Sequence, residues 1–294
     1  MAEQKIAVPD VSWMGDEPLE TESSFALART GEIPFSSVDE IEDWEVILPS
    51  KSDRLCLSYE DHVFPMYEVV FKDMGFCLPF SDFQREVLRW TKLSPSQIHP
   101  NSYAFMSAFE LVCQYLRFSA SNNVFFTIFT VQRGTAWVSF RQNKKIFDIF
   151  AGKVRSFKER FFLVRPRSEV ALNTLLQAVE GKALVRRPFF PLCWSRDHFG
   201  YESKDFGRSV SSLTEEEKDV HLKLWAFVQS FLRGIKTNKR GNPMMSAKGK
   251  PVTKPRFINT YDLVVFEDPN DYLGSYTLSC FFFSSFVLFI IFHV

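Results

Sequence analysis

Residues 78–116 read LPFSDFQREVLRWTKLSPSQIHPNSYAFMSAFELVCQYL and contain the clearest structural signals in the chain. Ser81 stands before a mixed polar and apolar run, with Gln84 three residues later, which is the pattern of a helix capping box. A second predicted helix begins at Pro100, and its apolar residues recur at the spacings of one buried face: Phe105, Phe109, Val112 and Leu116. The segment Leu93-Ser94-Pro95 ends the first helix, so two helices joined by a turn are expected.

Short strand-like segments follow these helices. Residues 124–131 form an apolar, β-branched run typical of a buried strand, and residues 137–141 alternate as a half-buried strand does. Residues 146–150 and 160–164 are further strand candidates. Two helices followed by hairpin-linked strands predict an α+β domain with a small antiparallel sheet.

The flanking regions complete the expected organisation. Residues 1–50 are predicted to be an acidic, disordered arm, and residues 55–192 one domain with its core at 78–166. Residues 59–72 and 168–179 are additional helix candidates within that domain. Thr214 and Glu217 form a second capping box, which opens a separate C-terminal amphipathic helix over 213–236. A basic linker is expected over 237–260, and we recognise no internal repeat.

Charge is balanced in total but not along the sequence. The chain of 294 residues has 35 basic and 35 acidic side chains, so its net charge favours no class of partner. Acids dominate residues 1–45, whereas basic residues dominate 141–187, and residues 233–256 contain no acid. An acidic arm beside basic segments either masks them or keeps the chain soluble, and the second role is commoner.

Five distinctive segments occur in order: the Leu-Pro-Phe opening at Leu78, the turn LSPSQIHPNS at 93–102, the Phe-rich run at 124–131, the Trp-Val-Ser strand at Trp137 and the segment Lys-Glu-Arg-Phe-Phe at 158–162. Together they resemble a plant protein family, the gypsy-type transposon domain, which also carries the label transposase. The resemblance covers about a third of the chain. It implies a retroelement protein in a gag-like position, and it brings no catalytic residues with it.

Enzymatic chemistry is not expected. A transposase or integrase needs three carboxylates that hold two metal ions, and the segment expected to fold offers few acids, among them Glu86 and Glu110. The sequence has no Asp-Thr-Gly, Asp-Ser-Gly or Tyr-x-Asp-Asp motif and no zinc-spaced Cys and His pairs. His99 is read as a hydrogen-bonded turn residue and Cys113 as a buried apolar one. We therefore predict a non-enzymatic protein without a catalytic, metal or cofactor site; the alternative is a nucleic-acid-processing transposition protein.

The basic residues are the remaining candidates for a functional site. They could contact phosphates, with Trp137 and Phe157 stacking on bases, or form a solvated rim, which is the commoner arrangement. The candidate nucleic-acid residues are Arg141, Lys144, Lys145, Lys153, Arg155, Lys158, Arg160, Lys239 and Arg240. The candidate partners are nucleic acid bound weakly without sequence preference, a second copy of the chain, and a membrane.

The membrane candidate rests on the C-terminal tail. Residues 273–294 contain no charged side chain and are long enough to span a bilayer as a helix. Two interpretations stay open: a C-terminal membrane anchor spanning Leu273 to Phe292, or a translated T-rich non-coding stretch, since almost every residue type in it has T-rich codons. The five cysteines, odd in number, and the polar N-terminus predict an intracellular protein, nuclear or cytoplasmic, and a membrane protein if the tail is translated.

Overall fold

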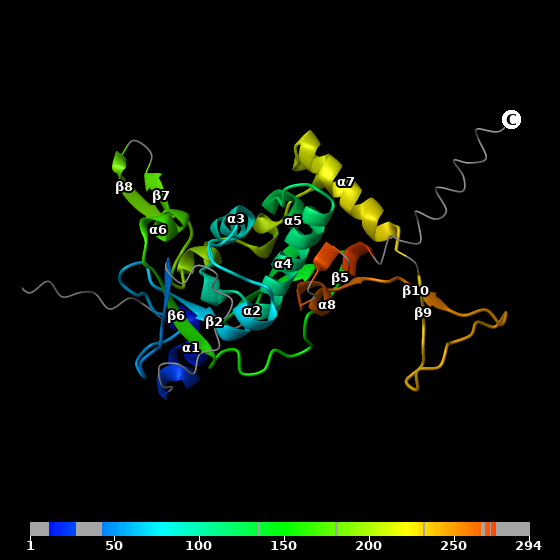
Figure 1. Ribbon diagram of the computed structural model, residues 1–294, viewed down its shortest axis with the longest axis horizontal. Coiled ribbons are helices and arrows are strands. Elements are labelled where there is room, and N and C mark those ends of the chain that lie inside the picture. Colours follow the sequence, from blue (N-terminus) through cyan, green and yellow to red (C-terminus); the bar gives the residue numbers. More distant parts are fainter. Residues whose placement is uncertain are drawn as a thin grey trace, which may run out of the picture. The chain divides into compact units, whose positions relative to one another are not determined.

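The computed structural model describes residues 12–27, 43–134, 136–179, 182–231, 233–265, 268–270 and 272–274 (Figure 1). The chain divides into two compact units, each assembled from discontinuous segments. The first contains residues 1–103, 130–141 and 153–207, and the second contains 104–129, 142–152 and 208–294. These boundaries do not coincide with the continuous segment 55–192 that we expected to be one domain.

The first unit is built on a three-stranded antiparallel sheet. The central strand β6 (Phe161–Pro166) pairs with β1 (Trp44–Ile47) on one side and with β2 (Phe64–Tyr67) on the other. The register places Val46 and Phe64 opposite the same residue, Val164. Helices α2 (Glu68–Asp73) and α3 (Asp82–Thr91) follow β2, and later come helix α6 (Glu169–Leu175) and the hairpin of β7 (Leu176–Val179) and β8 (Lys182–Pro188). Three short 3-10 helices complete the unit near its ends: η1 (Ser12–Met14), η4 (Arg196–Gly200) and η5 (Ser203–Phe206).

The turn within LSPSQIHPNS is a buried junction of the first unit. The short 3-10 helix η3 (Pro95–Gln97) has no exposed residue, and its backbone carbonyls receive two phenol hydroxyls: Tyr103 donates to Pro95, and Tyr67 donates to Ser96. The Ser96 hydroxyl in turn donates to the Leu55 carbonyl and accepts from the Trp194 indole at 3.0 Å. The serine, proline and tyrosine residues in and around this turn therefore hold a buried hydrogen-bond network together.

The second unit is an aromatic core between helices. Helix α4 (Pro100–Tyr115) places Phe109 against Phe125 of helix α5 (Asn122–Ile128) and Phe105 against Phe129, the residue directly after α5. The Phe125 and Phe129 rings stack with centroids 4.2 Å apart. Two-residue strands β5 (Phe147–Asp148) and β11 (Ile258–Asn259) pair in parallel, and α8 (Thr260–Val265) follows β11 directly. Helix α7 (Glu215–Gln229), preceded by η6 (Val210–Ser212), packs on α5 instead of standing apart as expected.

The α+β class is confirmed, and so are the helices at α3, α4 and α7, although α7 ends at Gln229 and not at 236. The helix predicted over 168–179 is α6 only as far as Leu175, and the rest is the strand β7. The predicted helix over 59–72 is wrong in its first half, because residues 64–67 form β2 and only then does α2 begin. The predicted strand over 124–131 is also wrong: residues 122–128 form α5, and only 129–133 form β3 (Phe129–Arg133), which pairs with β4 (Val138–Gln142). Ser121 caps α5 by accepting a hydrogen bond from the Asn123 backbone, which favours the helix locally.

Part of the expected disordered arm is ordered, which corrects the boundary at residue 50. Helix α1 (Asp16–Glu20) and the 3-10 helix η2 (Ser24–Leu27) precede β1, and Met14 and Phe25 are buried. The Ser23 hydroxyl donates to the Phe161 carbonyl, and the Ser24 backbone donates to the Glu159 carbonyl. Residues 12–27 therefore pack beside β6 as part of the first unit, because they supply both apolar side chains and backbone pairing.

The expected basic linker is a folded projection, which we call the basic arm (residues 233–256). Its ends pair as β9 (Gly234–Ile235) and β10 (Thr253–Lys254), and the ribbon between them extends as an open loop (Figure 1). Three backbone hydrogen bonds join its legs in a ring: Lys236 donates to Val252 at 2.7 Å, Val252 to Met244 at 2.8 Å and Met244 to Lys236 at 2.8 Å. These three residues are eight apart, which corrects our finding of no internal repeat.

The repeat can also be read in the sequence of the arm. Residues 236–243 read KTNKRGNP and residues 244–251 read MMSAKGKP, so glycine and proline recur at the sixth and eighth positions. Gly241 and Gly249 have φ angles of 81° and 69°, a left-handed conformation that glycine adopts without strain. Each glycine closes one loop, with its backbone donating to Asn238 and to Ser246 respectively.

No helix in the described part of the chain has the length and apolarity needed to cross a membrane. Residues 275–294, which hold most of the hydrophobic tail, lie outside the described residues.

Candidate nucleic-acid interface

The nine candidate basic residues fall in both units. The first unit holds Arg141, Lys153, Arg155, Lys158 and Arg160, and the second holds Lys144, Lys145, Lys239 and Arg240. The sequence block at 141–160 is therefore divided, because residues 142–152 belong to the second unit and the residues on either side belong to the first. Proximity along the sequence does not make these residues one surface.

Two candidates in the first unit are held by contacts within that unit. The Lys158 ammonium forms an ion pair with Glu17 and lies 4.4 Å from the centre of the Trp137 ring. The Arg160 guanidinium binds the buried Glu68 carboxylate in a two-pronged pair, with one contact of 2.8 Å, and lies over the Phe25 ring. Arg160 therefore neutralises a carboxylate that is only 6% exposed, and holds the pKa of Glu68 below its ordinary value.

Lys144 and Lys145, which lie in the second unit, are also held by contacts within their own unit. Lys144 lies 4.1 Å from the centre of the Trp225 ring on α7. Lys145 forms an ion pair with Asp148 and lies 4.4 Å from the Phe257 ring centre. A phosphate that binds these lysines would compete with these cation–π and ionic contacts, each of which contributes up to about 1 kcal/mol at an exposed site.

The remaining first-unit candidates are exposed but scattered. Arg141 lies at the end of β4, while Lys153 and Arg155 lie in the loop before β6. None of these three makes an ion pair with any residue that the structure describes. They are compatible with a solvated rim, and the geometry does not join them into a groove.

The basic arm gathers a denser set of cations. Every residue from 233 to 256 is exposed except Gly234 and Val252, which are half-buried. The arm contains no acid and eight basic residues: Arg233, Lys236, Lys239, Arg240, Lys248, Lys250, Lys254 and Arg256. Only Lys239 and Arg240 were among the candidates. The other six basic residues lie in the same acid-free run, and that run was the sequence signal from which they could have been predicted.

The matched family now has a structural context. Residues 66–133 match the model of the family described as "Putative gypsy type transposon". No curated protein and no solved structure matches the chain.

The matched gypsy-type segment confirms the family resemblance, although with different limits. The match begins in β2, includes α3, η3, α4 and α5, and ends with β3. Residues 158–162, the last segment of the predicted resemblance, lie outside it. The basic arm also lies outside it. The family match therefore covers the chain from β2 to β3 and does not extend to the arm.

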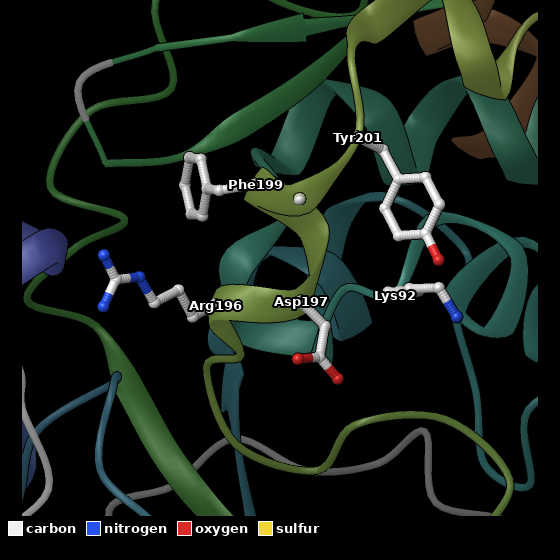
Figure 2. A pocket seen from close by; sticks show the side chains of 6 residues that line it. Lys92, Arg196, Asp197, Phe199 and Tyr201 are labelled. Carbon is white, nitrogen blue, oxygen red and sulfur yellow. The ribbon is translucent and has the colours of Figure 1, made fainter.

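One cavity of the first unit, of about 530 Å³, is lined by η4 and the C-terminus of α3. Lys92, in a left-handed conformation at the end of α3, lies over the Tyr201 ring at 5.5 Å. Figure 2 shows Asp197 and Tyr201 on the side of Lys92, whereas Arg196 points away from both. Lys92 and Arg196, the two cations that line the cavity, point in different directions (Figure 2), so they do not form a single anion site.

A smaller cavity of about 340 Å³ in the first unit includes His99, Trp137 and Lys158. The His99 ring accepts a hydrogen bond from the Asn101 backbone at 3.2 Å and meets the Phe157 ring edge-on. Burial, followed by the charge of Lys158, lowers the pKa of His99. This environment fits the predicted turn-forming role.

The buried thiols are unreactive at neutral pH. Burial raises the pKa of Cys113 to about 12 and that of Cys56 to about 11, so both remain protonated. Within the described residues, no group of three or more His, Cys, Asp or Glu side chains could hold a metal ion.

Proposed function

We propose that this chain is a non-enzymatic, gag-like protein of a gypsy-type transposon, and that it binds nucleic acid through the basic arm. The match over residues 66–133 supports the link to a transposon. The observation that carries the binding proposal is the arm itself, where eight exposed cations and no acid occupy 233–256. Such a surface attracts phosphates by releasing their counterions.

The arm is favoured over the block at 141–160 because Lys239 and Arg240 are exposed on a loop, whereas four charges of the block are held by contacts within their units. Lys144, Lys145, Lys158 and Arg160 each have an aromatic or carboxylate partner within their unit. Binding a phosphate there would require these contacts to be given up, whereas Lys239 and Arg240 lie on an exposed loop.

Two charge-reversed forms of the full chain test the proposal. Lys239→Glu with Arg240→Glu should abolish most binding to a labelled nucleic acid at low salt, whereas Lys144→Glu with Lys145→Glu should weaken it less. Affinity of the parent should fall steeply with salt. Absence of low-salt binding, or equal binding by the arm variant, would show the proposal to be wrong.

The alternative role is nucleic-acid processing, as the transposase label implies. It predicts strand cleavage or joining that depends on a divalent metal ion. Incubation of the same full-length chain and nucleic acid with and without Mg²⁺, followed by denaturing gel analysis, distinguishes this role from binding alone.

A further inference from the structure

We infer that the partner of the basic arm is double-stranded DNA, contacted along a groove through its phosphates and without base stacking. The inference rests on the proposed function and specifies its ligand. Three observations carry it: the chemical content of the arm, its hydrogen-bonded shape and the engagement of Asn238.

The content of the arm separates double-stranded from single-stranded ligands. Proteins that bind single strands combine a cationic groove with aromatic side chains on which the bases stack, and each stacked base contributes about 1–3 kcal/mol. The basic arm contains no Phe, Tyr, Trp or His between Arg233 and Arg256. Its favourable interactions are therefore electrostatic, and a duplex presents the higher density of phosphates.

The shape of the arm separates DNA from RNA duplexes. The ring of hydrogen bonds through Lys236, Met244 and Val252 ties the three legs together and leaves two loops projecting, closed by Gly241 and Gly249. The major groove of B-form DNA is wide enough for a β-ribbon. The corresponding groove of A-form RNA is too deep and narrow for side chains to read. Each loop is a hairpin with one antiparallel bridge at its base, Thr237 to Pro243 in the first and Met245 to Pro251 in the second. A two-stranded hairpin of this kind therefore fits duplex DNA better.

One of the two asparagines of the first loop, Asn238, is occupied by the arm itself. The Asn238 side-chain oxygen accepts from the Arg240 backbone at 2.9 Å and from the Asn242 backbone at 3.1 Å. Base-specific reading by asparagine requires its amide to form two hydrogen bonds with adenine, and here the amide oxygen is already used. Asn238 is therefore unavailable to read adenine in this way. We expect contacts to phosphates to dominate, so binding by the arm should depend little on base sequence.

The test uses the full chain and four labelled probes that carry equal numbers of phosphates: duplex DNA, duplex RNA, single-stranded DNA and single-stranded RNA. Duplex DNA should bind most tightly, and two duplexes of unrelated sequence should bind alike. Reversing Lys239 and Arg240 to Glu should weaken duplex binding roughly tenfold or more and lower the slope of log affinity against log salt by about two.

The matched control is Met245→Ser. Met245 is 57% exposed on the second leg, so its replacement changes the surface of the arm without changing its charge and should leave affinity unaltered. If another probe binds as tightly as duplex DNA while the arm variant still loses binding, the inference about the ligand is overturned and the proposed function stands. If the arm variant binds every probe as the parent does, both are overturned.

Discussion

His198 has ring nitrogens with fixed roles, and these make the first unit sensitive to acid. Its Nδ1–H donates to the Thr91 carbonyl at 2.8 Å, while Nε2 accepts from the Arg133 guanidinium at 3.2 Å. Protonation of Nε2 would remove the second bond and place one cation against another. Burial, with a contribution from the charge of Arg133, lowers the pKa of His198 from 6.5 to about 4.

The folded state therefore loses stability in acid through His198. The unfolded chain takes up a proton at this residue near pH 6.5, whereas the folded chain takes it up only near pH 4. The contribution is present above pH 6.5 and is lost as the pH falls toward 4. His198→Asn should flatten this decline in melting temperature, leaving the parts due to His99 and His221, whose pKa values burial also lowers. An unchanged decline in His198→Asn would contradict the assignment.

Arg160 and Arg165 provide a second test at the residue scale, because they form ion pairs of different burial. Glu68, the partner of Arg160, is 6% exposed, whereas Glu45, the partner of Arg165, is 32% exposed. Arg160→Met should lower the free energy of unfolding by about 1–3 kcal/mol by leaving a buried carboxylate without its partner. Arg165→Met should cost less than about 1 kcal/mol. Chemical denaturation measures both, and equal losses would contradict the ranking.

At the scale of elements, capping signals predicted where two helices begin, which apolar patterning alone does not define. Ser81 with Gln84 and Thr214 with Glu217 form the two predicted capping boxes, and both helices begin where those residues placed them. The run at 124–131 lacked such clarity because Val124, Phe125, Phe126 and Ile128 are all buried. A short run in which almost every residue is apolar or β-branched shows neither the period of a strand nor that of a helix.

The N-terminal segment was mistaken for disorder because its acidic composition outweighed a few apolar residues. Phe25 is 7% exposed and lies beneath Arg160. Phe25→Ala should therefore cost about 3 kcal/mol of unfolding free energy, as is usual for a large buried ring. Glu20→Ala, an exposed change in the same segment, should stay within about 0.5 kcal/mol. A loss of similar size in both variants would mean that the segment does not contribute a core residue.

At the scale of the whole molecule, the sequence predicts the fold class but not the assembly of its parts. The small strands β5 and β11 have two residues each and pair across more than a hundred positions. Segments this short carry no periodic signal. The same limit applies to the functional site: the acid-free run at 233–256 was recognisable, whereas the partners of Lys144, Lys158 and Arg160 depend on contacts distant in sequence.

The discontinuous units make a prediction about the segment 55–192. Cutting the chain there removes β1, Phe25 and the buried Trp194 and His198 from the first unit, and removes α7 with its buried Leu224 from the second. The exposed core surfaces should lower the melting temperature and broaden the transition, because cooperative unfolding requires the complete set of packed elements. Residues 12–274, which retain these elements, should melt in a sharper transition at higher temperature. Circular dichroism of the two segments during heating makes the comparison. A sharp transition in 55–192 at the temperature found for 12–274 would show that this continuous segment folds independently.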